Sequence, residues 1–67
     1  MWVRAKDSTH EVFLVIMFDN GGVFISFRYR TEKITYASLA QDWEWSSDLQ
    51  EWKPCGIEGN VTFATQV

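Results

Sequence analysis

The segment EVFLVIMFDNGGVFISFRYR, residues 11–30, places an Asn-Gly pair between two runs that are rich in β-branched and aromatic residues. This pattern favours a tight β-hairpin, because a primed turn needs a positive φ at both central positions. With Asn20 and Gly21 as the turn, one face of the hairpin is wholly apolar and is predicted to join the core. Its facing pairs are Phe18 with Val23, Ile16 with Ile25, Leu14 with Phe27, and Val12 with Tyr29.

The other face of this hairpin is apolar near the turn and charged away from it. A half-apolar second face is rarely left to water, so it predicts an interface between copies of the chain or a binding site. The alternative is a structural role, in which Glu11 pairs with Arg30 across the strands and an arginine packs over Phe13. The facing pairs are Met17 with Phe24, Val15 with Ser26, Phe13 with Arg28, and Glu11 with Arg30.

The segment ITYASLAQD, residues 34–42, breaks the strand alternation and predicts a helix of about two turns. Thr35 suits the N-cap, because its hydroxyl can accept a hydrogen bond from a backbone N–H of the first turn. Leu39 and Ala40 are then expected to face the sheet.

Three tryptophans lie within ten residues of DWEWSSDLQEWKPC, residues 42–55, and predict a second hairpin. With residues 47–50 as its loop, all three indoles share one face and an ion pair lies on the other. The facing pairs are Trp45 with Trp52, Glu44 with Lys53, and Trp43 with Pro54.

Strands are also predicted over residues 1–6 and 60–66. The whole chain, residues 1–67, is therefore expected to form one small β-rich domain. Its predicted class is mainly β (α+β), an antiparallel sheet of about six short strands with one short helix around residues 35–42. Three strands are expected before the helix and three after it.

A chain of 67 residues has a marginal core of its own. Its one cysteine, Cys55, cannot form an internal disulfide, and its one histidine, His10, does not complete a zinc-ligand spacing. Self-association is the remaining support for a small domain in which 46% of residues are hydrophobic. A homo-oligomer is therefore expected, assembled through the second face of the first hairpin.

The net charge of −3 is gathered in the second half of the chain, where Lys53 alone opposes five acidic residues. Duplex nucleic acid is not an expected partner, because phosphate neutralisation needs a basic patch. The longest apolar run, Val12–Phe18, is too short to cross a bilayer, and the chain opens with no secretory pattern. A cytoplasmic protein without a membrane partner is expected. The five acidic residues are Asp42, Glu44, Asp48, Glu51 and Glu58.

Catalysis is not expected from this set of residues. A serine or cysteine nucleophile needs an activating base, and His10 lies in a polar turn many positions from Cys55. The Gly21-Gly22 pair belongs to the hairpin and does not form a glycine-rich phosphate loop. No cofactor and no metal are predicted.

The tryptophans allow two interpretations. At least two of the three are expected to fill the core, since aromatic side chains dominate the interior of small domains. An exposed indole could instead stack on a nucleobase while an arginine binds phosphate. The predicted ligand-binding residues are Arg28, Arg30, Trp43, Trp45, Trp52, Phe13 and Tyr36.

The run WEWSSDLQEWKPC, residues 43–55, resembles the opening of a WWE domain, which has a Trp-x-Trp pair, a further Trp and then a Pro-Tyr step. Cys55 replaces the aromatic residue of that step. This resemblance implies binding of the ADP-ribose units of poly(ADP-ribose). The matching residues are Trp43, Trp45, Trp52 and Pro54.

The whole chain is similar in size and texture to the small acidic, aromatic-rich proteins that bacteriophages encode, especially over residues 34–55. Several such families counter host defence, and some act as oligomeric sponges for cyclic nucleotide or ADP-ribose-derived signals. The resemblance implies a non-catalytic protein of the host cytoplasm that sequesters a cyclic oligonucleotide or ADP-ribose type of ligand. The alternative is a protein inhibitor whose acidic half covers a basic surface of a host defence complex.

Overall fold

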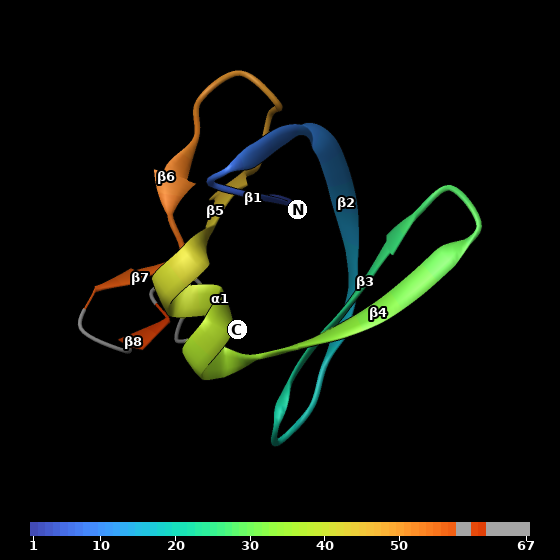
Figure 1. Ribbon diagram of the computed structural model, residues 1–67, viewed down its shortest axis with the longest axis vertical. Helices are drawn as coiled ribbons and strands as arrows, with labels where there is room; N and C mark the ends of the chain where they lie inside the picture. The colour runs from blue at the N-terminus through green and yellow to red at the C-terminus, as the bar shows by residue number, and fades with distance from the viewer. Residues whose placement is uncertain (58–59, 62–67) are drawn as a thin grey trace.

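Six strands form one antiparallel sheet in the computed structural model, which describes residues 1–57 and 60–61. Their order across the sheet is β4-β3-β2-β1-β5-β6, and β7 and β8 form a separate pair (Figure 1). The predicted class, a mainly β protein with a six-stranded antiparallel sheet and a short helix, is confirmed. The elements are β1 (Trp2–Ala5), β2 (Ser8–Phe18), β3 (Gly22–Phe27), β4 (Arg30–Thr35), α1 (Tyr36–Asp42), β5 (Trp43–Ser46), β6 (Lys53–Pro54), β7 (Gly56–Ile57) and β8 (Asn60–Val61).

Strand β3 ends at Phe27, earlier than predicted, and the chain reverses at Arg28 and Tyr29 to return as β4. Phe27 faces Arg30 across this turn. The φ angle of Arg28 is 56°, a left-handed conformation that suits the first position of a two-residue hairpin turn. The prediction of three strands before the helix was wrong, because Arg-Tyr is not a turn signal that sequence patterns reveal. As a result, the predicted pairing of Arg28 with Phe13 and of Tyr29 with Val12 does not form.

The β2–β3 turn lies at the predicted residues but is held in a different way. Neither Asn20 nor Gly21 takes a left-handed conformation, so the predicted primed turn was wrong. The carboxylate of Asp19 instead accepts hydrogen bonds from the backbone N–H groups of Gly21, at 2.8 Å, and Gly22, at 2.9 Å. The Asp19 N–H donates to the carbonyl of Gly22 at 2.9 Å. A side-chain cap thus replaces the positive φ angles.

Pairing of β2 with β3 starts in the predicted register at the turn, where Phe18 faces Val23. A β-bulge then leaves Ile16 as an extra residue, so that Val15 faces Ile25 in its place. Side chains alternate between the two faces of a strand, so one extra residue exchanges the faces of everything beyond it. The predicted pair of Ile16 with Ile25 was therefore wrong.

The bulge decides which part of β2 enters the core. Phe13 is buried, with 4% of its surface exposed, whereas Leu14 and Ile16 are 42% and 52% exposed. Leu14 faces Ser26. The prediction that Leu14 and Ile16 belong to the core was wrong, and so was the prediction for Tyr29, which is fully exposed.

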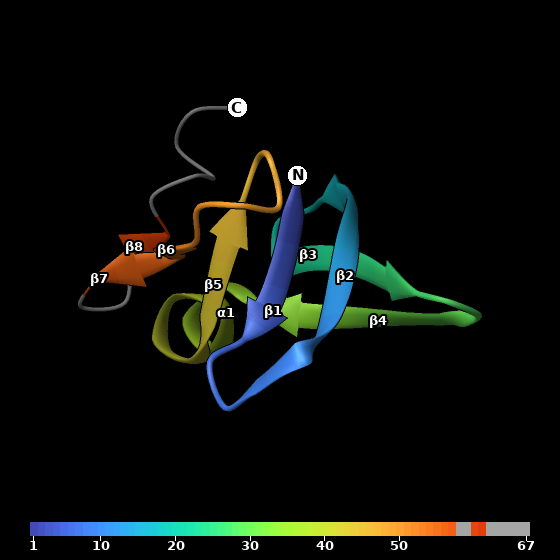
Figure 2. The same ribbon diagram turned by 90° about the horizontal axis from the view of Figure 1, so that it is seen from above.

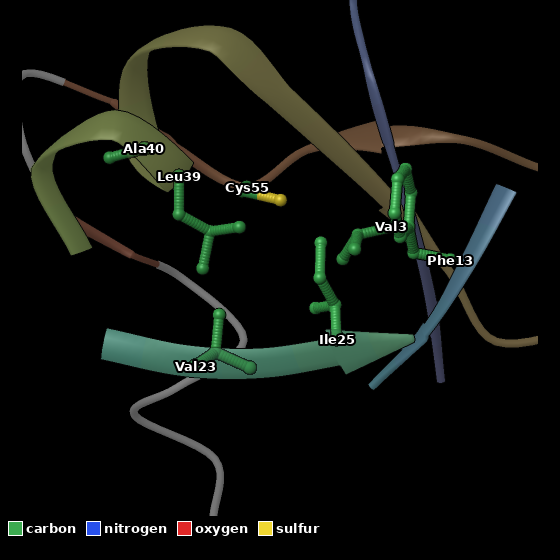
Figure 3. Close-up of a cluster of buried hydrophobic side chains, with 7 residues drawn as sticks. All are labelled: Val3, Phe13, Val23, Ile25, Leu39, Ala40 and Cys55. Atoms are coloured by element: carbon green, nitrogen blue, oxygen red, sulfur yellow. The ribbon is translucent and has the colours of Figure 1, made fainter. Parts of the chain in front are cut away.

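The helix α1 packs against the inner face of the bent sheet, beside the β7–β8 pair (Figures 1 and 2). Its N-cap is Thr35 as predicted, whose hydroxyl accepts the Ser38 N–H at 3.3 Å. Leu39 and Ala40 are buried, which confirms the predicted helix face. Figure 3 shows Leu39 reaching from α1 toward the β3 side chains. The buried hydrophobic residues are Val3, Phe13, Val23, Ile25, Leu39, Ala40 and Cys55.

The second hairpin pairs one residue out of the predicted register. Trp45 faces Lys53, and Glu44 faces Pro54, so the loop between β5 and β6 is longer than expected. Trp52 therefore precedes β6 and does not face Trp45. Of the predicted last strand, residues 60–61 form β8, and the remainder lies outside the described residues.

Candidate functional site

The β3–β4 turn gathers two arginines and an exposed tyrosine, and residues 27–30 are called the arginine turn here. Figure 1 shows it at the far end of the hairpin from α1. Arg28, Tyr29 and Arg30 are all exposed, and Tyr29 is fully so. The protruding turn therefore exposes an aromatic ring between two cations.

Both guanidinium groups of the arginine turn lie near aromatic rings. The Cζ atom of Arg30 is 5.7 Å from the ring centroid of Phe13 and 5.5 Å from that of Phe27. The Cζ atom of Arg28 is 5.3 Å from the Phe27 ring. Phe13 and Phe27 are themselves 5.3 Å apart. These contacts are within the range of cation–π attraction and restrict where the two charges can lie.

Arg30 also pairs with Glu11, whose Oε2 atom lies 3.2 Å from an Nη atom of the guanidinium. The predicted Glu11–Arg30 ion pair is present, although Arg30 makes it from β4 and not from the facing position on β3. An arginine also lies over Phe13, but it is Arg30 in place of Arg28, which the predicted register put opposite this ring. The side chains of Arg30 and Glu11 are 54% and 35% exposed, so water weakens the pair. A phosphate group could compete for this guanidinium, since arginine binds phosphate through two parallel N–H donors.

Two of the three clustered tryptophans pack against the core. Trp43 and Trp45 are partly buried beside the core cluster, so the expectation that at least two indoles fill the core is met only in part. The Trp43 ring meets Phe13 edge-on, with centroids 5.6 Å apart. Tyr36 also has a structural contact, because its hydroxyl donates a hydrogen bond to the Asp19 carbonyl at 2.7 Å. Among the predicted aromatic site residues, Phe13 contacts Arg30 of the turn.

Trp52 lies under a different cation. The Cζ atom of Arg4 is 4.1 Å from the Trp52 ring, and the Arg4 Nε–H donates to Glu44 Oε1 at 2.6 Å. Arg4 and Glu44 face each other across β1 and β5, on the side of the sheet opposite to Trp45. This group ties the β5–β6 loop to the sheet. The sequence did not predict this contact of Arg4, because 48 positions separate it from Trp52.

The β5–β6 loop is organised by Ser46 and Asp48. The buried Ser46 hydroxyl accepts the N–H of Asp48 and Leu49 and donates to Asp48 Oδ1 at 3.0 Å. The same oxygen accepts the Glu51 N–H at 3.0 Å and that of Gln50 at 2.9 Å. These hydrogen bonds hold the pKa of Asp48 below its ordinary value, and the bond from the Glu51 N–H has the largest effect.

Two carboxylates of the acidic half accept hydrogen bonds that hold the fold. These are Glu44, which is partly buried, and Asp48, which is exposed as Asp42 and Glu51 are. Glu58 lies outside the described residues. The acidic surface predicted for a protein inhibitor therefore has two fewer free carboxylates than its sequence suggests.

Cys55 is fully buried, and burial raises the pKa of its thiol to about 12. Within residues 1–57 and 60–61, no group of three or more His, Cys, Asp or Glu side chains is placed to hold a metal ion. No helix in the described part of the chain is long and apolar enough to cross a membrane.

Comparison with protein-family models, curated proteins and solved structures finds no match to this chain. The arginine turn contains Arg28 and Arg30, which were predicted, and adds Tyr29, which was not. The signal that could have found Tyr29 is the Arg-Tyr-Arg alternation, but pairing it with Val12 placed it in the predicted core.

Proposed function

We propose that this chain is a non-catalytic binding protein that takes a signalling nucleotide at the arginine turn. The observation that carries the proposal is the position of Arg30, whose guanidinium lies over Phe13 and Phe27 at an exposed hairpin end. A second guanidinium, from Arg28, lies over the same Phe27 ring. Two positive charges held near one point favour a ligand with more than one phosphate.

The aromatic ring of Tyr29 would let the site distinguish a nucleotide, which has a base, from a simple polyanion, which has none. Its ring lies between the two arginines in sequence and is fully exposed. A nucleobase stacked on an aromatic side chain gains about 1–3 kcal/mol. The proposed ligand therefore places a base on Tyr29 and phosphate groups on Arg28 and Arg30.

The backbone of the turn supports a role for the Arg28 side chain. A non-glycine residue in the left-handed region costs about 1–2 kcal/mol, and glycine at the same position avoids the cost. Arg28 is held there at a φ of 56°. An arginine at a position that favours glycine is expected where its charge is used.

Sequestration of a defence signal is the biological role that such binding would serve, in line with the phage-like character of the sequence. A sponge binds its ligand and releases it unchanged. The cyclic di- and trinucleotides, ADP-ribose and its cyclic forms are the ligands to test, and ADP-ribose also tests the resemblance to the WWE domain.

The experiment is a thermal-shift series with this panel, followed by chromatography of the ligand after incubation. A ligand at about 100 times its Kd adds about 2.7 kcal/mol to the stability of the folded state. In a domain of this size that raises the Tm by roughly 10 °C or more. A shift that Tyr29→Ala and Arg30→Ala both remove, with the ligand recovered intact, is the expected result. No shift with any member of the panel would refute nucleotide binding.

Inorganic phosphate separates charge from base recognition in the same series. It should give a much smaller shift than the nucleotide, because it cannot stack on Tyr29. An equal shift with phosphate would show an unspecific anion site. Reversing the exposed Asp42 and Glu51 to lysine should leave nucleotide binding intact, whereas the alternative function, an acidic protein inhibitor, depends on those charges.

A further inference from the structure

The ion pair between Glu11 and Arg30 joins two strands that are not neighbours in the sheet. Strand β3 lies between β2 and β4 (Figure 1), so Arg30 reaches past the Phe27 ring to meet Glu11 on β2. An Nη atom of Arg30 lies 3.2 Å from Glu11 Oε2. The proposed phosphate site therefore has a carboxylate beside one of its two cations.

Arg30 keeps most of its hydrogen-bonding capacity in this pair. A guanidinium has several N–H donors, and Glu11 accepts a hydrogen bond from one Nη atom. The side chain of Arg30 is 54% exposed, so its other donors are within reach of a ligand. A phosphate that accepts from two parallel donors can thus bind while Glu11 stays in place.

The aromatic contacts keep the guanidinium next to Glu11. Its Cζ atom lies 5.7 Å from the ring centroid of Phe13 and 5.5 Å from that of Phe27. Phe13 is buried, so its ring is fixed by the core. Movement of Arg30 away from Glu11 toward a ligand would sacrifice both cation–π contacts. A phosphate bound to Arg30 therefore lies close to the Glu11 carboxylate.

The charge of a phosphate decides how well it tolerates this neighbour. The Arg30–Glu11 pair has no net charge, so Arg28 supplies the one unbalanced positive charge among the three side chains. A phosphodiester carries a single negative charge, whereas a phosphate monoester carries about 1.5–2 at pH 7. The additional charge of the monoester is costly to dehydrate and gains little from a neutral pair.

We infer that Glu11 determines specificity at the arginine turn by selecting nucleotides whose phosphate groups each carry one negative charge over nucleotides that end in a free phosphate. The inference rests on the nucleotide binding proposed above and narrows its ligand class. Cyclic nucleotides meet the condition, because ring closure leaves no terminal phosphate. Hydrolysis of one phosphodiester bond opens the ring and leaves a terminal monoester, which the site selects against.

The experiment uses linear dinucleotides of adenine and of guanine, each with a free 5′-phosphate or with that phosphate as its methyl ester. The two forms have the same base and differ by one ionisable oxygen. Calorimetric titration of the parent and of Glu11→Gln gives a Kd for each form. Glutamine has the size of glutamate and still accepts a hydrogen bond from Arg30, so the guanidinium stays in position. The parent should bind the methyl ester at least as tightly as the free phosphate.

Glu11→Gln should shift this preference toward the free phosphate. In water, a carboxylate about 5 Å from a phosphate weakens binding by about fourfold for each charge on that phosphate. Its removal should therefore strengthen binding of the methyl ester about fourfold and of the free phosphate about 16-fold. Glu51→Gln is the matched control, because it removes the same charge from an exposed residue of the β5–β6 loop. It should leave the ratio of the two Kd values unchanged.

Two results would overturn the role of Glu11. An equal gain for both forms, or weaker binding of both in Glu11→Gln, would show that this carboxylate only positions Arg30. The cyclic nucleotides test the proposed function separately. If the parent binds one of them and Glu11→Gln leaves the ratio for the linear pair unchanged, nucleotide binding stands and Glu11 is not its selector. If the parent binds no nucleotide, cyclic or linear, both proposals are wrong.

Discussion

The carbonyl oxygen of Ile34 lies in the space that a Cβ atom on Gly22 would occupy. Strands β3 and β4 therefore approach closely only because residue 22 has no side chain. The contact is with backbone, which cannot rotate away as a side chain can.

Gly22→Ala should therefore destabilise the protein. We expect a loss of about 2–3 kcal/mol, typical of overpacking at a buried position, and a fall in Tm on the order of 10 °C. Gly21→Ala is the matched control, since the nearest atom to its Cβ is the mobile Nζ of Lys33 at 3.3 Å. Thermal unfolding should show little change for Gly21→Ala. Equal effects at the two glycines would contradict the close approach of β4.

Arg28→Gly should separate stability from binding. Glycine removes the left-handed strain at this position, so we expect a gain of about 1 kcal/mol together with loss of the proposed nucleotide binding. Arg28→Ala keeps the strain and should lose binding without gaining stability.

Leu49→Gly is the control for that comparison. Leu49 also has a left-handed φ, of 66°, but lies in the β5–β6 loop. It should gain a similar stability and bind the nucleotide as the parent does. Denaturant unfolding and a titration with the ligand found in the panel measure the two effects, and binding that survives in Arg28→Gly would remove Arg28 from the site.

The bulge in β2 makes opposite predictions for two adjacent residues. Phe13→Ala removes a buried ring and should cost about 3–5 kcal/mol, enough to unfold so small a domain in part. Leu14→Ala removes a half-exposed side chain and should cost under about 1 kcal/mol. Chemical denaturation of both variants tests the register. In a strand without the bulge, Leu14 would be the more costly residue to remove.

Stability should fall in acid because of Asp19 and Asp48. A hydrogen bond from Lys33 leads the causes that lower the pKa of Asp19, and the Glu51 N–H leads those that lower the pKa of Asp48. A carboxylate with a lowered folded pKa stabilises the folded state above its ordinary pKa of 3.8 and loses this effect as pH falls through the folded value.

Unfolding measured from pH 7 down to pH 2 should therefore show a decline that begins near the ordinary carboxyl pKa. Asp48→Asn should be less stable than the parent at neutral pH and should lose less on acidification. A parent curve that stays flat throughout this range would show that these carboxylates do not hold the two loops.

Several local features could be predicted because their causes lie within a few residues. Thr35 caps α1 through a bond to Ser38, three positions away. Asp19, Asn20 and the two glycines that follow reverse the chain, although the side chain of Asp19 does so rather than a primed turn. Alternation of apolar residues was enough for a mainly β class, and composition was enough for two indoles that pack against the core.

The arrangement of the site depended on contacts between distant residues. Alternation along β2 allows either Leu14 and Ile16 or Phe13 and Val15 to face inward, since all four are apolar. Packing against β1, β3 and α1 selects the second set through a single bulge, and a period of two residues carries that choice along the strand. The same tertiary packing sets Arg30 over Phe13 and Arg4 over Trp52. These contacts could not be predicted, because the alternation of residues along a strand does not indicate which distant ring lies near each cation.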